Sequence, residues 1–507
     1  MANNILLPLN RDYEDYLRDE SRRIGTAETI SFPTNEAEVI EAILQIRVIG
    51  GNITVQGSRT GIVGGAVPQG GHILNLSRMK SIGQIIREEQ SGELLVNVEP
   101  GVLLSELRDF AAREGLFFPP DPTETSASLG GMVACNASGA LSFHYGPTRN
   151  WVTSLRVVLS DGSTIDLRRG ENQACGRAFS LRTEQGRIIC GTLPSYTLPN
   201  VKSAAGYYVA DNMDLVDLFI GSEGTLGVIT KIELRLIPKP AAVAGLTIFL
   251  PDEESALKLV RYLRSQSTDY GDPISLRPVA IEFFNSDALN LLRRMKTESS
   301  AFADIPTLRP HFHTALYTEF HGDSDEAIEC AVMQVMEVAM TMGASDDDTW
   351  FATNERELEP LKAFRHATPE AVNLLIDERK RECPGLTKLG TDMSVPDEYL
   401  ESTLRMYNAE LREAGLESVI FGHIGNNHLH VNILPHTLEE YDRGRELYLS
   451  WARRVVEVGG SVSAEHGIGK IKAPFLVMMY GDEAVGEMRD LRRIFDPEGI
   501  LNPGNLF

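Results

Sequence analysis

Hydrophobic residues recur with a helical spacing in several segments of the first half of the chain. In residues 34–50 they lie three and four positions apart after a Thr-Asn start, which predicts an amphipathic helix. Residues 103–115 repeat this pattern and end on Gly115, where a helix is expected to stop. A shorter, charged helix is predicted in residues 12–25.

Other segments of the same half read as β-strands. Residues 152–168 alternate apolar and polar positions on either side of Asp161-Gly162, which predicts a β-hairpin. Strands are also predicted in residues 72–85 and 93–101. This mixture of helices and strands predicts an α+β domain.

The pattern changes after Pro238 and Pro240, which mark the expected domain boundary. From about Ala241 strands and helices alternate without glycine-rich loops, in residues 246–250, 252–266, 278–284, 311–320 and 324–340. Such a β-α-β order predicts a ferredoxin-like sheet with helices on one face.

A glycine-rich loop interrupts the first domain at residues 54–68. Its bare backbone allows successive N–H groups to form a concave nest for an anion such as phosphate. No helix follows the loop directly, so its donors are expected to come from the loop itself, although a plain turn is the alternative. The residues concerned are Gly57, Ser58, Arg59, Thr60, Gly61, Gly64 and Gly65.

Two more stretches expose backbone in a similar way. Residues 117–152 are rich in proline, glycine and small polar residues, and their prolines argue against regular structure. A long surface loop is one interpretation, but long irregular segments inside compact domains are usually functional. Residues 221–225 interrupt the apolar segment 215–240 in the same manner.

Composition narrows the classes of function. The chain has 507 residues and a formal net charge of −23, which excludes nucleic acid as the expected partner. It has no run of 18 apolar residues, and acidic residues stand near the start where a signal peptide would be basic, so no membrane span is expected. We place the protein in the cytoplasm, with peripheral association with the inner membrane left open. The five cysteines are widely spaced without a C-x-x-C pair and are expected to be buried or inert thiols.

Metal-competent side chains gather in two short segments near the C-terminus. Residues 417–435 place His423, His428 and His430 on or beside a strand, and residues 459–475 add Glu465 and His466. Imidazole and carboxylate ligands with room for a substrate oxygen are typical of an open divalent-metal site. Hydrogen-bonded core or surface histidines are the alternative, but the clustering favours a site. His466 would then be free to act as a base.

Arg365 is the candidate for binding an anionic substrate. It lies on a predicted helix among apolar and small residues, and a guanidinium suits a carboxylate. A solvated surface arginine is an equally weighted alternative. Lys388 is a weaker candidate of the same kind, and a surface charge is the favoured interpretation for it.

Six motifs in order resemble the flavin-dependent D-2-hydroxyacid dehydrogenases. They are GSRTGIVGGAVP, PPDPTETSASLGGMVACNASG, GSEGTLGVITKIELRLIP, GHIGNNHLH, SAEHGIGK and DPEGILNPG, and the resemblance runs from about Ile30 to Phe507. The family includes D-lactate dehydrogenase, the glycolate oxidase flavin subunit and D-2-hydroxyglutarate dehydrogenase, within the vanillyl-alcohol oxidase/p-cresol methylhydroxylase fold.

The resemblance implies an α+β fold in three parts. A two-subdomain FAD-binding domain would occupy residues 1–239, an α+β cap with an antiparallel sheet residues 240–465, and a C-terminal segment returning to the FAD domain residues 466–507. FAD would be bound without a covalent link, because the glycine loop offers no His or Cys to tether it.

The same resemblance assigns roles to individual residues. The Gly57 to Gly65 loop would wrap the FAD diphosphate, and Glu223, Gly227 and Ile229 would hold the adenine side. Asn432 would lie beside the flavin ring. The ribityl chain and isoalloxazine would be lined by Pro120, Asp121, Ser126, Gly130, Gly131, Asn136, Ser138 and Gly139. The metal ligands would be His423, His430 and Glu465 for Zn, Mn or Fe, and the catalytic base would be His466.

Three departures from the family pattern affect these assignments. The family usually has G-H-x-G-D-G-N-L-H, whereas this chain has Asn426, Asn427 and His428, so a carboxylate near the metal is replaced and an imidazole is added. Pro369 stands where some members have a substrate-binding Thr. Lys388 is displaced from the position of the family's substrate Lys.

The resemblance implies oxidation of a D-2-hydroxy acid of the D-lactate type to the 2-oxo acid. Arg365 would hold the substrate carboxylate, His466 would take the hydroxyl proton, and the C2 hydride would pass to flavin N5. Electrons would go to a separate acceptor, namely an electron-transfer flavoprotein, a quinone, an iron–sulfur protein or oxygen. Two alternatives stay open: a flavin subunit that works inside a larger electron-transfer complex, and a non-redox enzyme like alkylglycerone-phosphate synthase. A homodimer is also left open.

Overall fold

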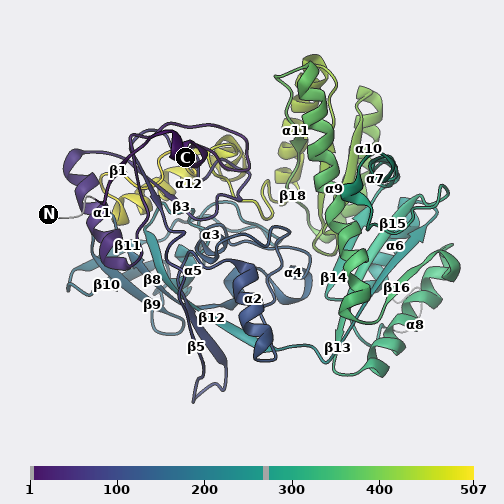
Figure 1. Cartoon of the computed structure of the whole chain (residues 1–507), viewed down its shortest axis with the longest axis horizontal. Coiled ribbons are helices and arrows are strands. Elements are labelled where there is room, and N and C mark those ends of the chain that lie inside the picture. The colour runs from purple at the N-terminus through teal and green to yellow at the C-terminus, as the bar shows by residue number, and fades with distance from the viewer. Residues whose placement is uncertain (1–4, 266–272) are drawn as a thin grey trace.

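Three β-sheets and one separate hairpin organise the computed structural model, which describes residues 5–265 and 273–507. Residues 1–4 of the expected FAD domain and Gln266 of the expected helix 252–266 lie outside the described residues. In Figure 1 the purple and blue first part of the chain and the teal and green cap occupy opposite sides of the molecule.

The first sheet has four strands in the order β1 (Leu7–Pro8), β2 (Thr29–Ser31), β4 (His72–Asn75) and β3 (Ile53–Gln56). The predicted helix 34–50 is confirmed as α1 (Glu36–Ile49), which Asn35 caps at its start and left-handed Gly50 ends. The predicted helix 12–25 is wrong beyond its first turns. A 3-10 helix covers Arg11–Leu17, and the chain then turns back so that the Gly25 N–H donates to the Leu17 carbonyl.

The second sheet is antiparallel and carries the predicted hairpin. Its order is β5 (Ile82–Arg87), β6 (Leu94–Val98), β12 (Val228–Pro238), β8 (Val152–Val158) and β9 (Thr164–Arg168), with β7 (Leu116–Phe117) pairing with β12. The hairpin of β8 and β9 is confirmed, as is the helix ending before Gly115, which is α2 (Leu104–Arg113). The remaining elements here are α5 (Val216–Phe219) and the hairpin of β10 (Ala178–Arg182) and β11 (Ile188–Thr192).

Residues 117–152 contain more regular structure than their prolines predicted. They form α3 (Leu129–Cys135), α4 (Ser142–Tyr145) and a 3-10 helix at Thr148–Trp151. Pro119, Pro120 and Pro122 lie before α3 and Pro147 lies after α4, and the Ser128 side chain caps α3 by accepting from the Gly131 N–H. Small residues also let this helix pack closely, since a Cβ on Gly130 would lie 2.5 Å from Pro100.

The cap holds a large antiparallel sheet. Its strands run in the order β16 (Trp350–Ala352), β13 (Ala242–Leu250), β15 (Thr314–Gly322), β14 (Ala280–Phe284), β19 (Ser418–Gly422), β20 (His428–Ile433) and β17 (Leu389–Gly390), with β18 (Met393–Ser394) also pairing with β20. The first four strands have the order of a ferredoxin-like unit, which the other strands extend.

Helices cover both faces of the cap sheet, so the prediction of helices on one face is wrong. Leu246 and Ile248 of β13 share a core with α6 (Glu253–Leu263) and α8 (Asp325–Thr341). Phe249, which points to the opposite face, shares a second core with α7 (Ser286–Glu298) and α9 (Glu355–Glu382). β13, β14 and β15 are buried at nearly every position, so both of their faces are covered.

The chain returns to its first domain at the end. After α10 (Leu400–Ala414) and α11 (Leu438–Glu457), α12 (Ala473–Phe495) leads back to the N-terminal side, where it is the yellow helix in Figure 1. Leu501 then forms a parallel bridge with Ile53 of β3. Short 3-10 helices lie at Ser300–Phe302, Asp346–Asp348, Asp397–Tyr399 and Ile424–Asn426. No helix in the described part of the chain is long and apolar enough to cross a membrane.

The cysteines differ from the prediction in their exposure. All five are free, but Cys175, Cys190 and Cys330 are exposed, and Cys135 and Cys383 are half-buried. Cys175 and Cys190 lie at the β10–β11 hairpin, where a two-stranded ribbon has too few neighbours to bury its side chains.

Candidate active site

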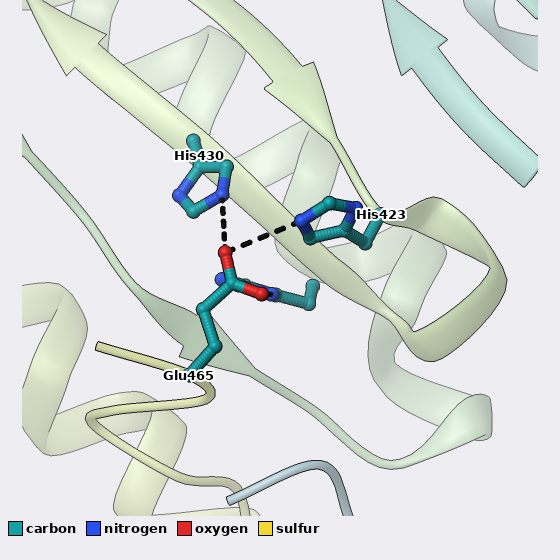
Figure 2. Close-up of side chains that lie close together, drawn as sticks. His423, His430 and Glu465 are labelled. Atoms are coloured by element: carbon teal, nitrogen blue, oxygen red, sulfur yellow. Dashed lines mark hydrogen bonds and ion pairs between the residues drawn. The ribbon is translucent and has the colours of Figure 1, made fainter. Parts of the chain in front are cut away.

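One carboxylate oxygen of Glu465 faces two histidines from the cap. Glu465 lies in the loop between α11 and α12, and its Oε1 is 3.2 Å from Nε2 of His423 and 3.3 Å from Nε2 of His430 (Figure 2). Atoms that share one metal ion at about 2.1 Å lie about 3.0–3.5 Å apart. Both histidines of the predicted ligand set therefore lie at the spacing from Glu465 that a shared metal ion requires. The ligand atoms of these three residues and of His428 all lie within 4.8 Å of one another.

Second partners orient both histidine rings. His423 donates from Nδ1 to Oε1 of buried Glu282 at 2.7 Å, and His430 donates from Nδ1 to the Thr391 carbonyl at 3.0 Å. Both Nε2 atoms are thus directed at Glu465. Burial alone would lower the pKa of His423, but Glu282 and Glu465 outweigh burial and raise it to about 9. The site stabilises a positive charge at this nitrogen, which a divalent cation would also supply.

The other oxygen of Glu465 is held by residues from the first domain. Lys202 Nζ lies 2.6 Å from Glu465 Oε2, and Ser138 Oγ donates to the same oxygen at 3.2 Å. Ser138, which the resemblance assigned to the lining of the ribityl chain and isoalloxazine, therefore also contacts the predicted metal ligand Glu465.

His466 lies beside the same carboxylate but is oriented by a different acid. Its Nδ1 is 3.3 Å from Oδ2 of Asp392, and its Nε2 is 3.6 Å from Glu465 Oε1. Burial lowers the pKa of His466 despite Asp392, so the ring is neutral at pH 7. Lys472 also contacts Asp392, at 2.6 Å. An Nδ1–H held by Asp392 leaves Nε2 as the proton acceptor.

His428 lies next to the three-ligand site and is fully buried. Only Leu429 separates it from His430 on β20, so the two rings share one face of the strand, and their centroids are 4.4 Å apart. Its Nε2 is 3.0 Å from Asp392 Oδ1, and its Nδ1 is 3.4 Å from Lys202 Nζ. Burial holds the pKa of His428 well below its usual range, so the added imidazole is a neutral group between two charged neighbours.

Arg365 is buried, which rules out the interpretation as a solvated arginine. It lies on α9, where Nη2 donates to Oδ2 of Asp121 at 3.1 Å, and Asp121 also contacts Arg108 at 2.8 Å. Although burial would raise the pKa of Asp121, Arg365 and Arg108 hold it well below its usual range. Nε of Arg365 is buried and has no hydrogen-bond partner among the described residues. A guanidinium with an unused buried donor suits a carboxylate ligand.

Lys388 differs from the surface charge that was favoured for it. It is half-buried, and its Nζ donates to Oδ1 of Asn373 on α9 at 3.0 Å. Burial lowers the pKa of Lys388. Its contacts in the described structure tie it to α9 rather than to the histidines.

The glycine loop meets the start of α3. Ser58 N donates to Ser128 Oγ at 3.3 Å, and a Cβ on Gly57 would lie 2.0 Å from the same oxygen. Gly61 has open space around it, with no atom within 4 Å of an added Cβ. We expected no helix to adjoin the loop. This expectation is wrong, because the start of α3, which is distant in sequence, packs against the loop. Arg59 instead packs over the Tyr16 ring at 4.3 Å.

The remaining predicted cofactor residues lie on both sides of this loop. Glu223 is buried and accepts from the N–H groups of Ile468 and Gly469, each at 2.7 Å. Its carboxylate therefore anchors the C-terminal segment. The other positions are spread over the structure: Gly227 and Ile229 at the start of β12, Asn136 at the end of α3, Asn432 on β20, Gly131 inside α3, Ser126 on the surface, Gly139 against the Asp121 carbonyl, and Pro120 accepting from Arg108.

Sequence reasoning missed four side chains of the site. Lys202 and Asp392 come from segments without a recognisable pattern, so no signal in the sequence could have found them. Glu282 lies in the predicted strand 278–284, where a carboxylate among apolar residues was the available signal. Lys472 lies seven residues after Glu465 in the same segment, and this proximity was the available signal.

Known proteins resemble the chain over nearly its whole length. It is 31% identical to a probable mitochondrial D-lactate dehydrogenase of Danio rerio, covering 97% of this chain and 87% of the relative. It is 29% identical to a D-lactate dehydrogenase of Anaerostipes hadrus (97% and 92% covered) and to a D-2-hydroxyglutarate dehydrogenase of Xanthomonas citri (98% and 93% covered). A solved structure of alkyldihydroxyacetonephosphate synthase has a TM-score of 0.67 at 17% identity, covering 99% of this chain and 82% of that one, which supports the fold alone.

Two protein families match separate parts of the chain. "FAD binding domain" matches residues 27–168, and "FAD linked oxidases, C-terminal domain" matches residues 239–506, which is more than half of the chain. The architecture is a mixed α/β FAD-binding domain of the p-cresol methylhydroxylase type followed by an oxidase domain with an antiparallel sheet. The chain belongs to the FAD-linked oxidases, as an FAD-dependent oxidoreductase of the 2-hydroxyacid dehydrogenase family.

Proposed function

We propose that this protein oxidises a D-2-hydroxy acid of the D-lactate type to the 2-oxo acid and passes the electrons to a separate acceptor. The observation that carries the proposal is the convergence of His423, His430 and His466 on one oxygen of Glu465. Relatives of 29–31% identity named D-lactate dehydrogenase support the substrate class.

FAD is the cofactor that the family match indicates, and the glycine loop fits it. Gly61 offers open space, and Gly57 brings the Ser58 N–H and the start of α3 together. We assign the diphosphate to this loop and the flavin ring to the face formed by Ser138 and Asn432, held without a covalent bond. When bound, FAD supplies the acceptor for the hydride.

The three-ligand cluster fits a divalent cation such as Zn, Mn or Fe. Two histidine Nε2 atoms and a carboxylate oxygen converge with the right spacing, and their other partners fix the rings. When bound, the metal polarises the hydroxyl group of the substrate. Three protein ligands leave a coordination position for that hydroxyl.

The chain's own residues would then bind the substrate and move one proton. Arg365 binds the carboxylate with the guanidinium donors that Asp121 does not use. Nε2 of His466 accepts the hydroxyl proton, while Asp392 stabilises the resulting imidazolium. FAD held at the glycine loop would accept the hydride from C2 as C2 and its oxygen form the carbonyl, and the two electrons would then pass to the separate acceptor.

Anaerobic bleaching of the flavin tests this proposal. The native protein should lose its yellow absorbance with D-lactate, whereas His466→Ala should keep its flavin and bleach about 10²- to 10⁴-fold more slowly. His436→Ala, at an exposed position outside the site, is the matched control. Unchanged bleaching in His466→Ala would contradict the role of the base.

The same assay, run with glycolate and D-2-hydroxyglutarate, ranks the substrates. Bleaching by any of these acids also separates oxidation from a flavin-dependent exchange reaction without net oxidation. If no 2-hydroxy acid bleaches the flavin, the proposed oxidation is wrong.

Metal removal is a second test of the proposal. Treatment with a chelator should abolish bleaching while leaving the flavin bound, because none of the three proposed metal ligands belongs to the glycine loop. Zn²⁺ or Mn²⁺ should restore the activity. Full bleaching in protein shown to be free of divalent metal would contradict the metal site.

A further inference from the structure

The carboxylate of Glu465 is divided between two kinds of partner. Oε1 faces the histidines of the cap, whereas Oε2 receives the ammonium of Lys202 at 2.6 Å and the hydroxyl of Ser138 at 3.2 Å. Both partners of Oε2 come from the FAD-binding half of the chain. The ammonium of Lys202 is unexpected beside Glu465, because Glu465 is a proposed ligand of another cation.

The backbone around Lys202 fixes this lysine in place. Ser394 Oγ donates to the Lys202 carbonyl at 2.6 Å, and the Ala204 N–H donates to the Ser463 carbonyl at 2.8 Å. Ser203 Oγ also lies 2.9 Å from Ser461 Oγ. Lys202 and the two residues after it are thus hydrogen-bonded to β18 and to the loop that carries Glu465. The side chain of Lys202 is about nine-tenths buried, at 10% exposure.

An ammonium in this position has two physical effects on a metal ligand. With Oε2 occupied by Lys202 and Ser138, Glu465 can offer a metal one oxygen rather than two, so one more coordination position stays free. The positive charge also repels a cation held on Oε1, at a separation of about 5 Å in a poorly screened site. The first effect favours substrate access, and the second weakens metal binding.

We infer that Lys202 is a positioning residue of the proposed metal site, which holds Glu465 as a one-oxygen ligand and keeps the loaded site more positive. The inference rests on the proposed metal-dependent function and deepens it. A divalent ion, one carboxylate and one ammonium leave a net charge of about +2, which favours an anionic 2-hydroxy acid in the open position. Lys202 thus weakens metal binding and at the same time makes the loaded site more positive.

Metal affinity provides a test with an unusual sign. Removal of an ordinary structural lysine should loosen the site, whereas Lys202→Met should bind Zn²⁺ about tenfold more tightly, because the repulsion is gone. Lys202→Arg keeps the charge and should stay within about threefold of the native dissociation constant. The measurement is competition for Zn²⁺ with a chromogenic chelator on the flavin-loaded protein. Lys80→Met, an exposed lysine paired with Glu106, is the control for loss of one charge.

If the native protein binds Zn²⁺ and Lys202→Met binds it equally well or more weakly, the inference about Lys202 is wrong while the proposed function stands. If the native protein binds no divalent metal, the metal-dependent part of the proposed function fails and the inference fails with it. Bound flavin absorbance and circular dichroism check that each variant is folded. If Lys202→Met does not fold, Lys202→Gln carries the same comparison.

Discussion

Histidine is used in two opposite ways in this chain. The ring of His423 lies between two carboxylates that raise its pKa to about 9, whereas burial lowers the pKa of His72 to about 4. His72 is fully buried on β4, with Thr29 Oγ1 and Ser31 Oγ each 2.8 Å from a ring nitrogen. Hydroxyl partners satisfy a neutral ring but supply no negative charge, so the two environments select opposite charge states.

The buried His72 predicts a loss of stability in mild acid. An unfolded histidine takes up a proton near pH 6.5, but folded His72 takes it up near pH 4, so stability is present above pH 6.5 and falls as the pH drops through this window. Between pH 7 and pH 5 this residue should cost about 2 kcal/mol of unfolding free energy.

Urea denaturation at the two pH values checks this prediction. His72→Gln cannot titrate, so the native protein should lose about 2 kcal/mol more than the variant between pH 7 and pH 5. Each protein serves as its own reference at pH 7, which removes any cost of the substitution itself. Equal losses in the two proteins would contradict the prediction.

At the scale of elements, the glycine loop and α3 form one unit although 70 residues separate Ser58 from Ser128. The helix 129–135 could not be predicted because prolines and glycines dominate its neighbourhood, and its stability comes from the Ser128 cap and from packing against Pro100. Strongly periodic elements such as α1 and the β8–β9 hairpin needed no such tertiary support to be recognised. The two-sided cap sheet could have been foreseen from the nearly continuous apolar runs of β13 and β14.

Two glycines of the loop provide a matched pair of substitutions. A Cβ at Gly57 would lie 2.0 Å from Ser128 Oγ, so Gly57→Ala must displace the cap of α3. We expect its unfolding free energy to fall by about 1–3 kcal/mol. Gly61→Ala meets no atom within 4 Å and should leave the stability of the FAD-free protein unchanged.

Thermal melts of both variants without FAD measure this difference. Equal melting temperatures would contradict the contact between the loop and α3. Weaker FAD binding in Gly61→Ala at unchanged stability would place the cofactor at the loop, because the protein itself leaves that space free.

At the scale of the whole molecule, the C-terminal segment closes the first domain. The Ile53 N–H donates to the Ile500 carbonyl, and the Asn502 N–H donates to the Ile53 carbonyl, each at 2.7 Å. The Asn502 side chain accepts from the Val55 N–H and donates to the Glu223 carbonyl, also at 2.7 Å each. Asn502 thus joins β3 to Glu223, whose carboxylate accepts from the Ile468 N–H.

Asn502→Ala should therefore destabilise the whole FAD-binding half. The change leaves the Val55 N–H and the Glu223 carbonyl without their Asn502 partner, and we expect the unfolding free energy to fall by about 2–4 kcal/mol. Denaturant titration followed by flavin release measures the effect. Asn290→Ala, at an exposed position on α7, is the control. Equal midpoints for the two variants would show that the C-terminal segment does not support the first domain.

The sequence by itself determined the periodic elements, the change of style after Pro240 and the residue types of the site, because spacing and chemistry are local properties of a chain. It placed His423, His428 and His430 together since they share one strand and its turn. Tertiary structure alone decided which partners complete them. Lys202, Glu282 and Asp392 reach Glu465 and the histidines from three separate segments, and no local pattern records that approach. The glycine loop likewise meets the start of α3, at Ser128, only in the folded structure. Two segments far apart in sequence can form hydrogen bonds with each other once they pack together.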